Sequence, residues 1–126
     1  MRVLIVDDEE KVLLAMRRML SDCCAIDCAG SATEALEKAK TGEYDFVLLD
    51  FRMPKQDGLW FLRNCKLPRK AKIILLTAYL NKELVKEMFR LGVSSYLMKP
   101  VTREDVLRHF ECLSNPRPVE RLCATV

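Results

Sequence analysis

The stretch Phe46-Val47-Leu48-Leu49-Asp50-Phe51-Arg52-Met53-Pro54 contains an apolar run that ends at a single carboxylate. Turn residues follow, first Pro54 and then Gly58. An apolar run bounded by turn signals is typical of a strand buried on both faces, as in a parallel sheet. Asp50 would then lie where the strand leaves the sheet, at the edge where open α/β sheets bind ligands. Taken alone, an aspartate here could simply cap the following turn. Whether Asp50 belongs to a binding site therefore depends on the residues that follow the other strands.

The rest of the chain repeats this alternation of apolar runs and amphipathic segments. We predict further strands at residues 3–6, 25–29, 72–77 and 95–98, of which 25–29 is the weakest and suits a sheet edge. We predict helices at residues 9–20, 32–41, 58 to about 64 or 66, 82–91 and 103–113. Five strands alternating with five helices indicate a doubly wound parallel sheet with right-handed crossovers.

The composition narrows the class of protein. A chain of 126 residues is one domain by size, and its net charge of +3 is too small to predict nucleic-acid binding. No segment has the length of a membrane-spanning helix, and the first residues do not form a signal peptide. Six cysteines without a secretion signal favour reduced thiols in a cytoplasmic protein. Their spacing is not that of a zinc site.

Polar residues follow four of the predicted strands. Asp7 and Asp8 follow the first, Asp50 ends the third, Thr77 ends the fourth, and Lys99 follows the fifth. Three carboxylates at one edge repel each other unless a cation joins them, and Mg²⁺ with retained waters fits such oxygen ligands. Lysine and hydroxyl groups beside them would neutralise and orient a phosphoryl group. The pattern therefore predicts phosphoryl transfer with Asp50 as the nucleophile.

These segments also resemble a known family. Four matching motifs occur in order: Leu4-Ile-Val-Asp7-Asp8-Glu9, Leu49-Asp50-Phe-Arg-Met-Pro54 with Asp57-Gly58, Leu76-Thr77-Ala78 and Met98-Lys99-Pro100. Together they resemble the receiver domain of two-component response regulators over residues 1–113. The resemblance implies a flavodoxin-like (βα)5 fold with strand order 2-1-3-4-5. Residues 114–126 would form a tail or a linker.

The resemblance also implies roles for individual residues. Asp50 would accept a phosphoryl group from a phosphohistidine of a sensor histidine kinase or a phosphotransfer protein. Asp8, Asp50 and the backbone carbonyl of Arg52 would hold Mg²⁺, and Asp7 would act mainly through water. Thr77 and Lys99 would bind the phosphoryl group, and the Lys99-Pro100 peptide bond would be cis.

By the same resemblance, the chain would be a switch and not an enzyme acting on a separate substrate. It would at most catalyse its own phosphorylation and dephosphorylation. Tyr96 would turn inward on activation, although it could equally be ordinary strand packing. Residues 82–113 would present the output face, which would regulate a partner or an output domain. A homodimer through this face also fits, and no contact with nucleic acid or membrane is expected.

Two residues depart from the family's commonest pattern, Arg52 and Tyr79. Neither can orient an attacking water as an acid or an amide does, so they predict slow loss of phosphate. Two other functions stay open at this stage. One is a receiver-like binding module that needs no phosphorylation. The other is a Mg²⁺-dependent phosphatase or phosphotransferase, which would need a substrate pocket and for which no P-loop is present.

Overall fold

The computed structural model describes residues 1–52, 57–65, 71–78 and 81–114. In this part of the chain, five strands alternate with five helices, and no helix is long and apolar enough to cross a membrane. The strands are β1 (Arg2–Val6), β2 (Ala25–Ala29), β3 (Phe46–Asp50), β4 (Lys72–Thr77) and β5 (Ser95–Met98). The helices are α1 (Glu10–Leu20), α2 (Ala32–Thr41), α3 (Gly58–Asn64), α4 (Lys82–Arg90) and α5 (Arg103–Ser114).

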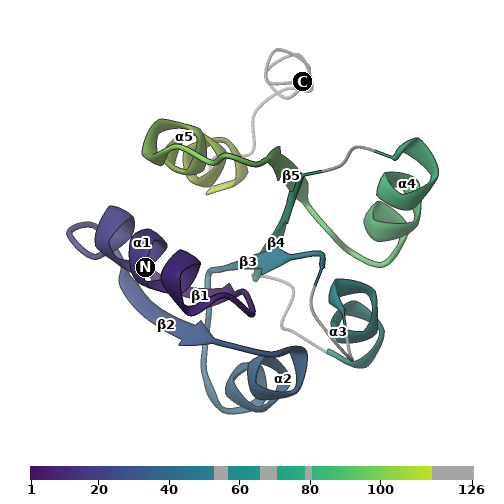
Figure 1. Cartoon of the computed structure of the whole chain (residues 1–126), viewed down its shortest axis with the longest axis horizontal. Coiled ribbons are helices and arrows are strands. Elements are labelled where there is room, and N and C mark those ends of the chain that lie inside the picture. The colour runs from purple at the N-terminus through teal and green to yellow at the C-terminus, as the bar shows by residue number, and fades with distance from the viewer. Residues whose placement is uncertain (53–56, 66–70, 79–80, 115–126) are drawn as a thin grey trace.

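The strands form one parallel sheet in the order β2-β1-β3-β4-β5 (Figure 1). This confirms the predicted fold class, the strand order and the edge position of the segment 25–29. Every residue of β3 is buried, as its continuous apolar run predicts for a central parallel strand. All five strands end at the same edge of the sheet, because every neighbouring pair runs parallel.

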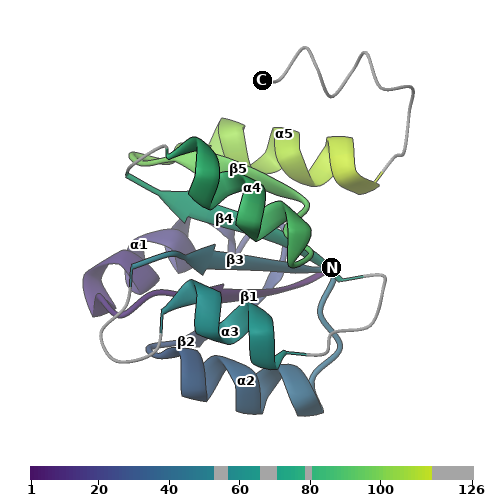
Figure 2. The same cartoon turned by 90° about the vertical axis from the view of Figure 1, so that its right-hand side faces the viewer.

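Helices cover both faces of the sheet (Figures 1 and 2). Helices α1 and α5 pack on one face, where Phe46 and Phe110 stack with ring centroids 4.2 Å apart. Helices α2, α3 and α4 pack on the other face against alternate strand residues such as Leu49 and Leu75. Each fully buried large apolar side chain contributes about 1.5–3 kcal/mol to folding, so these two layers hold the strand ends in place.

Several helix ends have the caps expected from the sequence. Ser31 Oγ accepts a hydrogen bond from Glu34 N at the start of α2, and Thr102 Oγ1 accepts one from Asp105 N beside α5. Gly92, just after α4, has a φ of 108°, a conformation that disfavours side chains with a Cβ. The predicted ends of two helices were slightly wrong. Helix α4 ends at Arg90, one residue early, and α5 includes Ser114.

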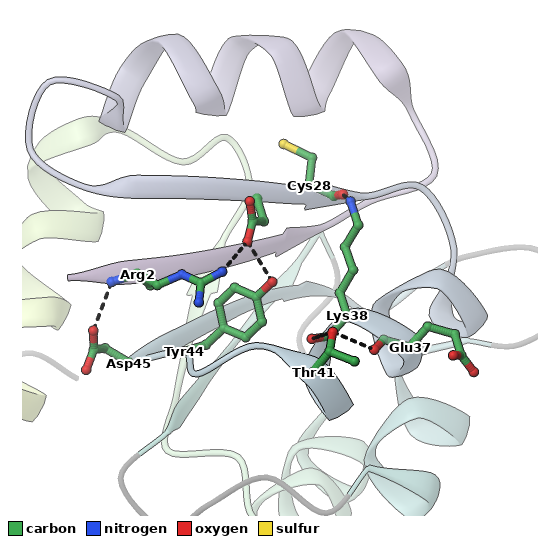
Figure 3. Close-up of polar contacts among 8 residues, drawn as sticks. Arg2, Cys28, Glu37, Lys38, Thr41, Tyr44 and Asp45 are labelled. Atoms are coloured by element: carbon green, nitrogen blue, oxygen red, sulfur yellow. Dashed lines mark hydrogen bonds and ion pairs between the residues drawn. The ribbon is translucent and has the colours of Figure 1, made fainter.

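A polar cluster joins the start of β1 to β2 and to the segment before β3 (Figure 3). Tyr44 is 2% exposed, and its hydroxyl donates a 2.7 Å hydrogen bond to Asp27 Oδ2. The Arg2 guanidinium donates to the same oxygen at 2.9 Å and lies over the Tyr44 ring at 4.9 Å. The Tyr44 hydroxyl, with help from Arg2, lowers the pKa of Asp27, and burial with Asp27 raises the pKa of Tyr44 to about 12.

We predict that Tyr44→Phe lowers the free energy of unfolding by about 1 kcal/mol at pH 7, because the Asp27 carboxylate loses a hydrogen-bond donor but stays partly hydrated. The folded-state pKa of Asp27 lies below its ordinary value of 3.8. Its stabilisation is therefore present above that pH and is lost as the pH falls through the folded-state pKa. Urea unfolding at pH 7 and at about pH 3 should show the difference shrinking in acid. An equal loss at both pH values would contradict this assignment.

Candidate functional site

The first strand delivers two adjacent carboxylates to the edge where the strands end. Asp7 follows β1 directly and is 1% exposed, whereas Asp8 is exposed. The Asp7 backbone N–H donates to Ala29 O at 3.1 Å, and Asp7 Oδ1 accepts from Glu9 N at 2.9 Å. The Asp7 carboxylate is thus fixed by the backbone, while Asp8 is open to solvent and to ligands.

The central strands bring two more polar groups to this edge. Asp50 ends β3, is 5% exposed and lies beside Leu76 in the parallel register. Thr77 ends β4 and is 6% exposed. The Lys99 backbone N–H donates to Thr77 O at 2.8 Å, which extends the pairing of β4 and β5 and fixes the start of the Lys99 side chain. The Lys99-Pro100 peptide bond is cis, as predicted.

The Lys99 ammonium lies between the two buried carboxylates. Its Nζ is 2.7 Å from Asp50 Oδ1 and 3.5 Å from Asp7 Oδ2. One carboxylate oxygen from each of Asp7, Asp8 and Asp50 lies within 4.8 Å of the others. The strand ends therefore bring together the four charged side chains that were predicted from the sequence, and Thr77 ends the strand next to Asp50.

Burial and charge act in opposite directions on this cluster. Burial raises the pKa of Asp50, and the neighbouring Asp7 and Asp8 add to that effect, while the hydrogen bond from Lys99 opposes it. Burial alone would lower the pKa of Lys99, but its hydrogen bond to Asp50 and the charges of Asp50 and Asp7 raise it overall. Among the ion pairs of the described residues, the Lys99 ammonium contacts two of the three clustered carboxylates.

This donor set suits a small, hard divalent cation. Carboxylate and carbonyl oxygens are the ligands that Mg²⁺ prefers, and Mg²⁺ keeps several waters when protein ligands are few. Asp8 is exposed, whereas Asp7 and Asp50 are buried, so an ion bound at Asp8 could keep water ligands. Lys99 would occupy the other side as a compact charge for a phosphoryl oxygen. The arrangement can therefore bind both a divalent ion and a phosphate group.

Helix α3 is held against this site by two residues that the sequence analysis did not single out for such a role. Asp57 Oδ1 accepts from Trp60 N at 3.1 Å and caps the helix. Gly58 N donates to Phe51 O at 3.0 Å, and a Cβ on Gly58 would lie 3.2 Å from Phe51 Cα. An aspartate and a glycine at the start of a helical segment were the signal, because a Cβ at Gly58 would press against the Phe51 backbone and shift it by a few tenths of an ångström.

The remaining predicted residues lie around the cluster. Arg52 is exposed just beyond β3. Tyr96 is half-buried in β5, packs against the core and meets the Phe89 ring edge-on at 6.3 Å. Tyr79 lies outside the described residues, as do Met53 and Pro54, so the expected slow loss of phosphate stays a prediction.

A parallel five-stranded sheet in this order, with an acidic cluster and a lysine at its carboxyl edge, defines the class of α/β phosphoacceptor switches. Residues 3–111 match the family described as the response regulator receiver domain. The chain belongs to this family. Receiver domains accept a phosphoryl group on an aspartate and regulate signalling in two-component systems.

Individual relatives agree with this assignment. The chain is 36% identical over 109 residues to the transcriptional regulatory protein ResD of Bacillus subtilis, which covers 85% of this chain and 45% of ResD. It therefore spans about half the length of that relative. A CheY-like receiver domain protein from Methanospirillum hungatei is 30% identical with a TM-score of 0.83, covering 90% of this chain and 93% of that one.

A third protein has the same fold at lower identity. The receiver domain of the sensor histidine kinase PA1611 from Pseudomonas aeruginosa is 24% identical with a TM-score of 0.80, covering 90% of this chain and 98% of that one. Its structure holds a magnesium ion coordinated in the active-site cleft.

Proposed function

We propose that Asp50 is the phosphoacceptor of this receiver domain. The observation that carries the proposal is the Lys99 ammonium 2.7 Å from a buried Asp50 carboxylate, with a carboxylate oxygen of Asp7 and one of Asp8 within 4.8 Å of an Asp50 oxygen. The phosphoryl donor would be a phosphohistidine on a sensor histidine kinase or a phosphotransfer protein. This makes the chain a regulatory phosphoacceptor that at most catalyses its own phosphorylation and dephosphorylation.

The transfer can be written from the geometry of these residues. An Asp50 carboxylate oxygen forms a bond to phosphorus as the bond from phosphorus to the donor's imidazole nitrogen breaks, and that nitrogen keeps the electron pair and takes up a proton. Lys99 moves from the Asp50 carboxylate to an oxygen of the transferred group, and the Thr77 hydroxyl donates to another. Phosphoryl transfer requires little covalent chemistry from the protein. Most of the catalysis would therefore come from positioning the phosphoryl group and neutralising its charge.

Mg²⁺ would be held by Asp8, Asp50 and the Arg52 backbone carbonyl, with Asp7 acting mainly through water. The PA1611 receiver, which has the same fold, holds magnesium in its cleft. When bound, the ion supplies positive charge for the phosphoryl oxygens. The exposed Asp8 is the carboxylate best placed to bind it directly, because Asp7 is buried and hydrogen-bonded to the backbone.

Phosphorylation would be read out by the face formed by α4, β5 and α5. Thr77 and Tyr96 would couple Asp50 to it, the first by binding the phosphoryl group and the second by moving inward. Phe89 on α4 and Met98 at the end of β5 are large apolar side chains that are 42% and 43% exposed, so a partner on this face could bury them. We propose this face as the contact with an output domain, a partner or a second copy of the chain.

Two further assignments follow the same proposal. Residues 1–113 would form the receiver domain, and residues 114–126 a tail or linker. The protein would act in the cytoplasm, in keeping with the free thiols of Cys23, Cys24, Cys28, Cys65 and Cys112 among the described residues. No direct contact of this domain with nucleic acid is proposed.

Incubation with acetyl phosphate and Mg²⁺, followed by intact-mass measurement, tests the proposed function. We expect a single phosphoryl adduct that is lost in hydroxylamine, as acyl phosphates are. The adduct should not form when EDTA replaces Mg²⁺. If the protein binds Mg²⁺ but forms no adduct, and a partner still binds it, the result would instead support the receiver-like binding module that needs no phosphorylation.

We predict that Mg²⁺ stabilises the folded protein and that Asp8→Asn removes this effect more than Asp7→Asn does. An ion bound with a Kd on the order of 1 mM adds about 1.4 kcal/mol to the free energy of unfolding at about 10 mM. Thermal melts with and without Mg²⁺ measure it, and Ca²⁺ serves as a second probe. An undiminished Mg²⁺ shift in Asp8→Asn would remove Asp8 from the site.

A further inference from the structure

Three sulfur atoms gather where the turn after α1 meets the start of the chain. The Cys23 and Cys24 Sγ atoms lie 3.6 Å apart, and Cys24 Sγ lies 3.8 Å from Met1 Sδ. The chain fold makes this meeting possible, because Ala25 N donates to Met1 O at 2.9 Å as β2 begins to pair beside β1. Cys24 Sγ therefore lies between the thiol of its neighbour in sequence and the thioether of the residue that precedes β1.

The spacing of these atoms matches that of sulfur ligands around one metal ion. Sulfur atoms held about 2.3 Å from an ion lie about 3.8 Å apart in a tetrahedral site and about 4.0 Å apart in a trigonal one. The two observed separations are close to these values. Binding one ion would also require rotation of the side chains to bring the Cys23 and Met1 sulfur atoms to a similar separation. The adjoining surface pocket, of about 250 Å³ and lined also by α5, leaves room for it to enter.

The kind of sulfur selects the metal. A thioether is a soft, uncharged ligand that accompanies thiolates at Cu(I), whereas zinc sites use cysteine, histidine and carboxylates. We propose that Cys23, Cys24 and Met1 form a binding site for a soft monovalent metal ion, Cu(I). On binding, each thiol releases its proton to solvent and Met1 adds a neutral donor, so the occupied site carries one negative charge.

A disulfide between Cys23 and Cys24 is the chief alternative use of these thiols. Adjacent residues have Cα atoms about 3.8 Å apart, below the range of about 4.4–6.8 Å that ordinary disulfides require. Pairing them would therefore distort the turn, while a metal bridges sulfur atoms at their present separation. The third sulfur, from Met1, has no part in a disulfide but completes a metal site.

An oxygen-free titration with Cu(I), buffered by bicinchoninate, tests this proposal. The full chain with Cys28, Cys65, Cys112 and Cys123 replaced by serine keeps only the proposed thiols. We expect it to withdraw one equivalent of Cu(I) from the chelator, and Cys24→Ser in the same background to weaken binding at least tenfold. Should the fourfold variant lack native circular dichroism, Cys24→Ser is compared with Cys28→Ser in the unmodified chain, where only the first should lose the tight equivalent.

Two further experiments test Met1 as the third ligand and Cu(I) as the preferred metal. In a chain with a short N-terminal extension, Met1→Leu should weaken Cu(I) binding several-fold relative to the same extended chain with Met1. Zn²⁺ in tenfold excess should not displace the Cu(I). Unchanged Cu(I) affinity in Cys24→Ser or in Met1→Leu, or displacement by Zn²⁺, would overturn the proposal.

Discussion

Asp50→Asn is expected to abolish phosphorylation by acetyl phosphate, with no adduct seen in intact mass under conditions that fully modify the unaltered chain. The amide oxygen is a far weaker nucleophile than the carboxylate, and no other described acid combines burial with a lysine ammonium at 2.7 Å. The loss should therefore reach the detection limit, at least 10³-fold in rate, which corresponds to about 4 kcal/mol in the barrier.

Asp57→Asn is the matched control for this experiment. Asparagine caps helices as well as aspartate, so this variant should keep the hydrogen bond to Trp60 N and retain the phosphoryl adduct. A stable adduct at full yield in Asp50→Asn would show that another residue is the acceptor. The fold of Asp50→Asn can be checked separately. Removing this carboxylate relieves its repulsion with Asp7 and Asp8, and Lys99 keeps Asp7 as a partner, so the variant should be about as stable as the unaltered chain at pH 7.

The positions of the strands and of most of the helices followed from the sequence, because apolar runs and amphipathic segments alternate along the chain. The spatial order of the strands came only from the resemblance to receiver domains. The run before Asp50 is apolar at every position, which only a strand covered on both faces tolerates, and the structure buries all of it. Parallel strands then place their following residues at one edge without further information. Asp7, Asp50 and Lys99 can therefore be grouped from the sequence alone.

The finer contacts did not follow, because they depend on side-chain direction. Nothing in the sequence indicates how closely Lys99 approaches Asp7, or that Tyr44 is buried with its hydroxyl on Asp27. The role of Gly58 depends on how closely α3 approaches Phe51, a distance set by packing. Similarly, the approach of Met1 to Cys24 joins the first residue of the chain to a turn and has no local sequence signal.

Lys99→Met should slow phosphorylation by acetyl phosphate about 10²–10³-fold, equivalent to about 2.7–4 kcal/mol, as expected when one preorganised donor to the reacting group is removed. Methionine keeps the length and most of the apolar stem of lysine but not its charge. Intact-mass time courses at saturating Mg²⁺ measure the rate. Lys86→Met, an exposed change on α4, is the control and should leave it unaltered.

The same substitution should also destabilise the metal-free protein in a pH-dependent way. Without the ammonium, the Asp50 and Asp7 carboxylates repel each other at a buried site. We expect the free energy of unfolding at pH 7 to fall by about 1–3 kcal/mol, a modest loss because Lys99 is only partly buried.

Since burial raises the pKa of Asp50 in the folded state, a proton there favours folding. The stability conferred by that proton is complete below the unfolded-state pKa and is lost as the pH rises through the folded-state pKa. The difference in the free energy of unfolding between Lys99→Met and the unaltered chain should therefore grow as the pH rises above about 4. Mg²⁺ should reduce this difference but should not restore the rate of phosphorylation. A variant as stable as the unaltered chain at pH 7, or one phosphorylated at the normal rate, would separate Lys99 from Asp50 in function.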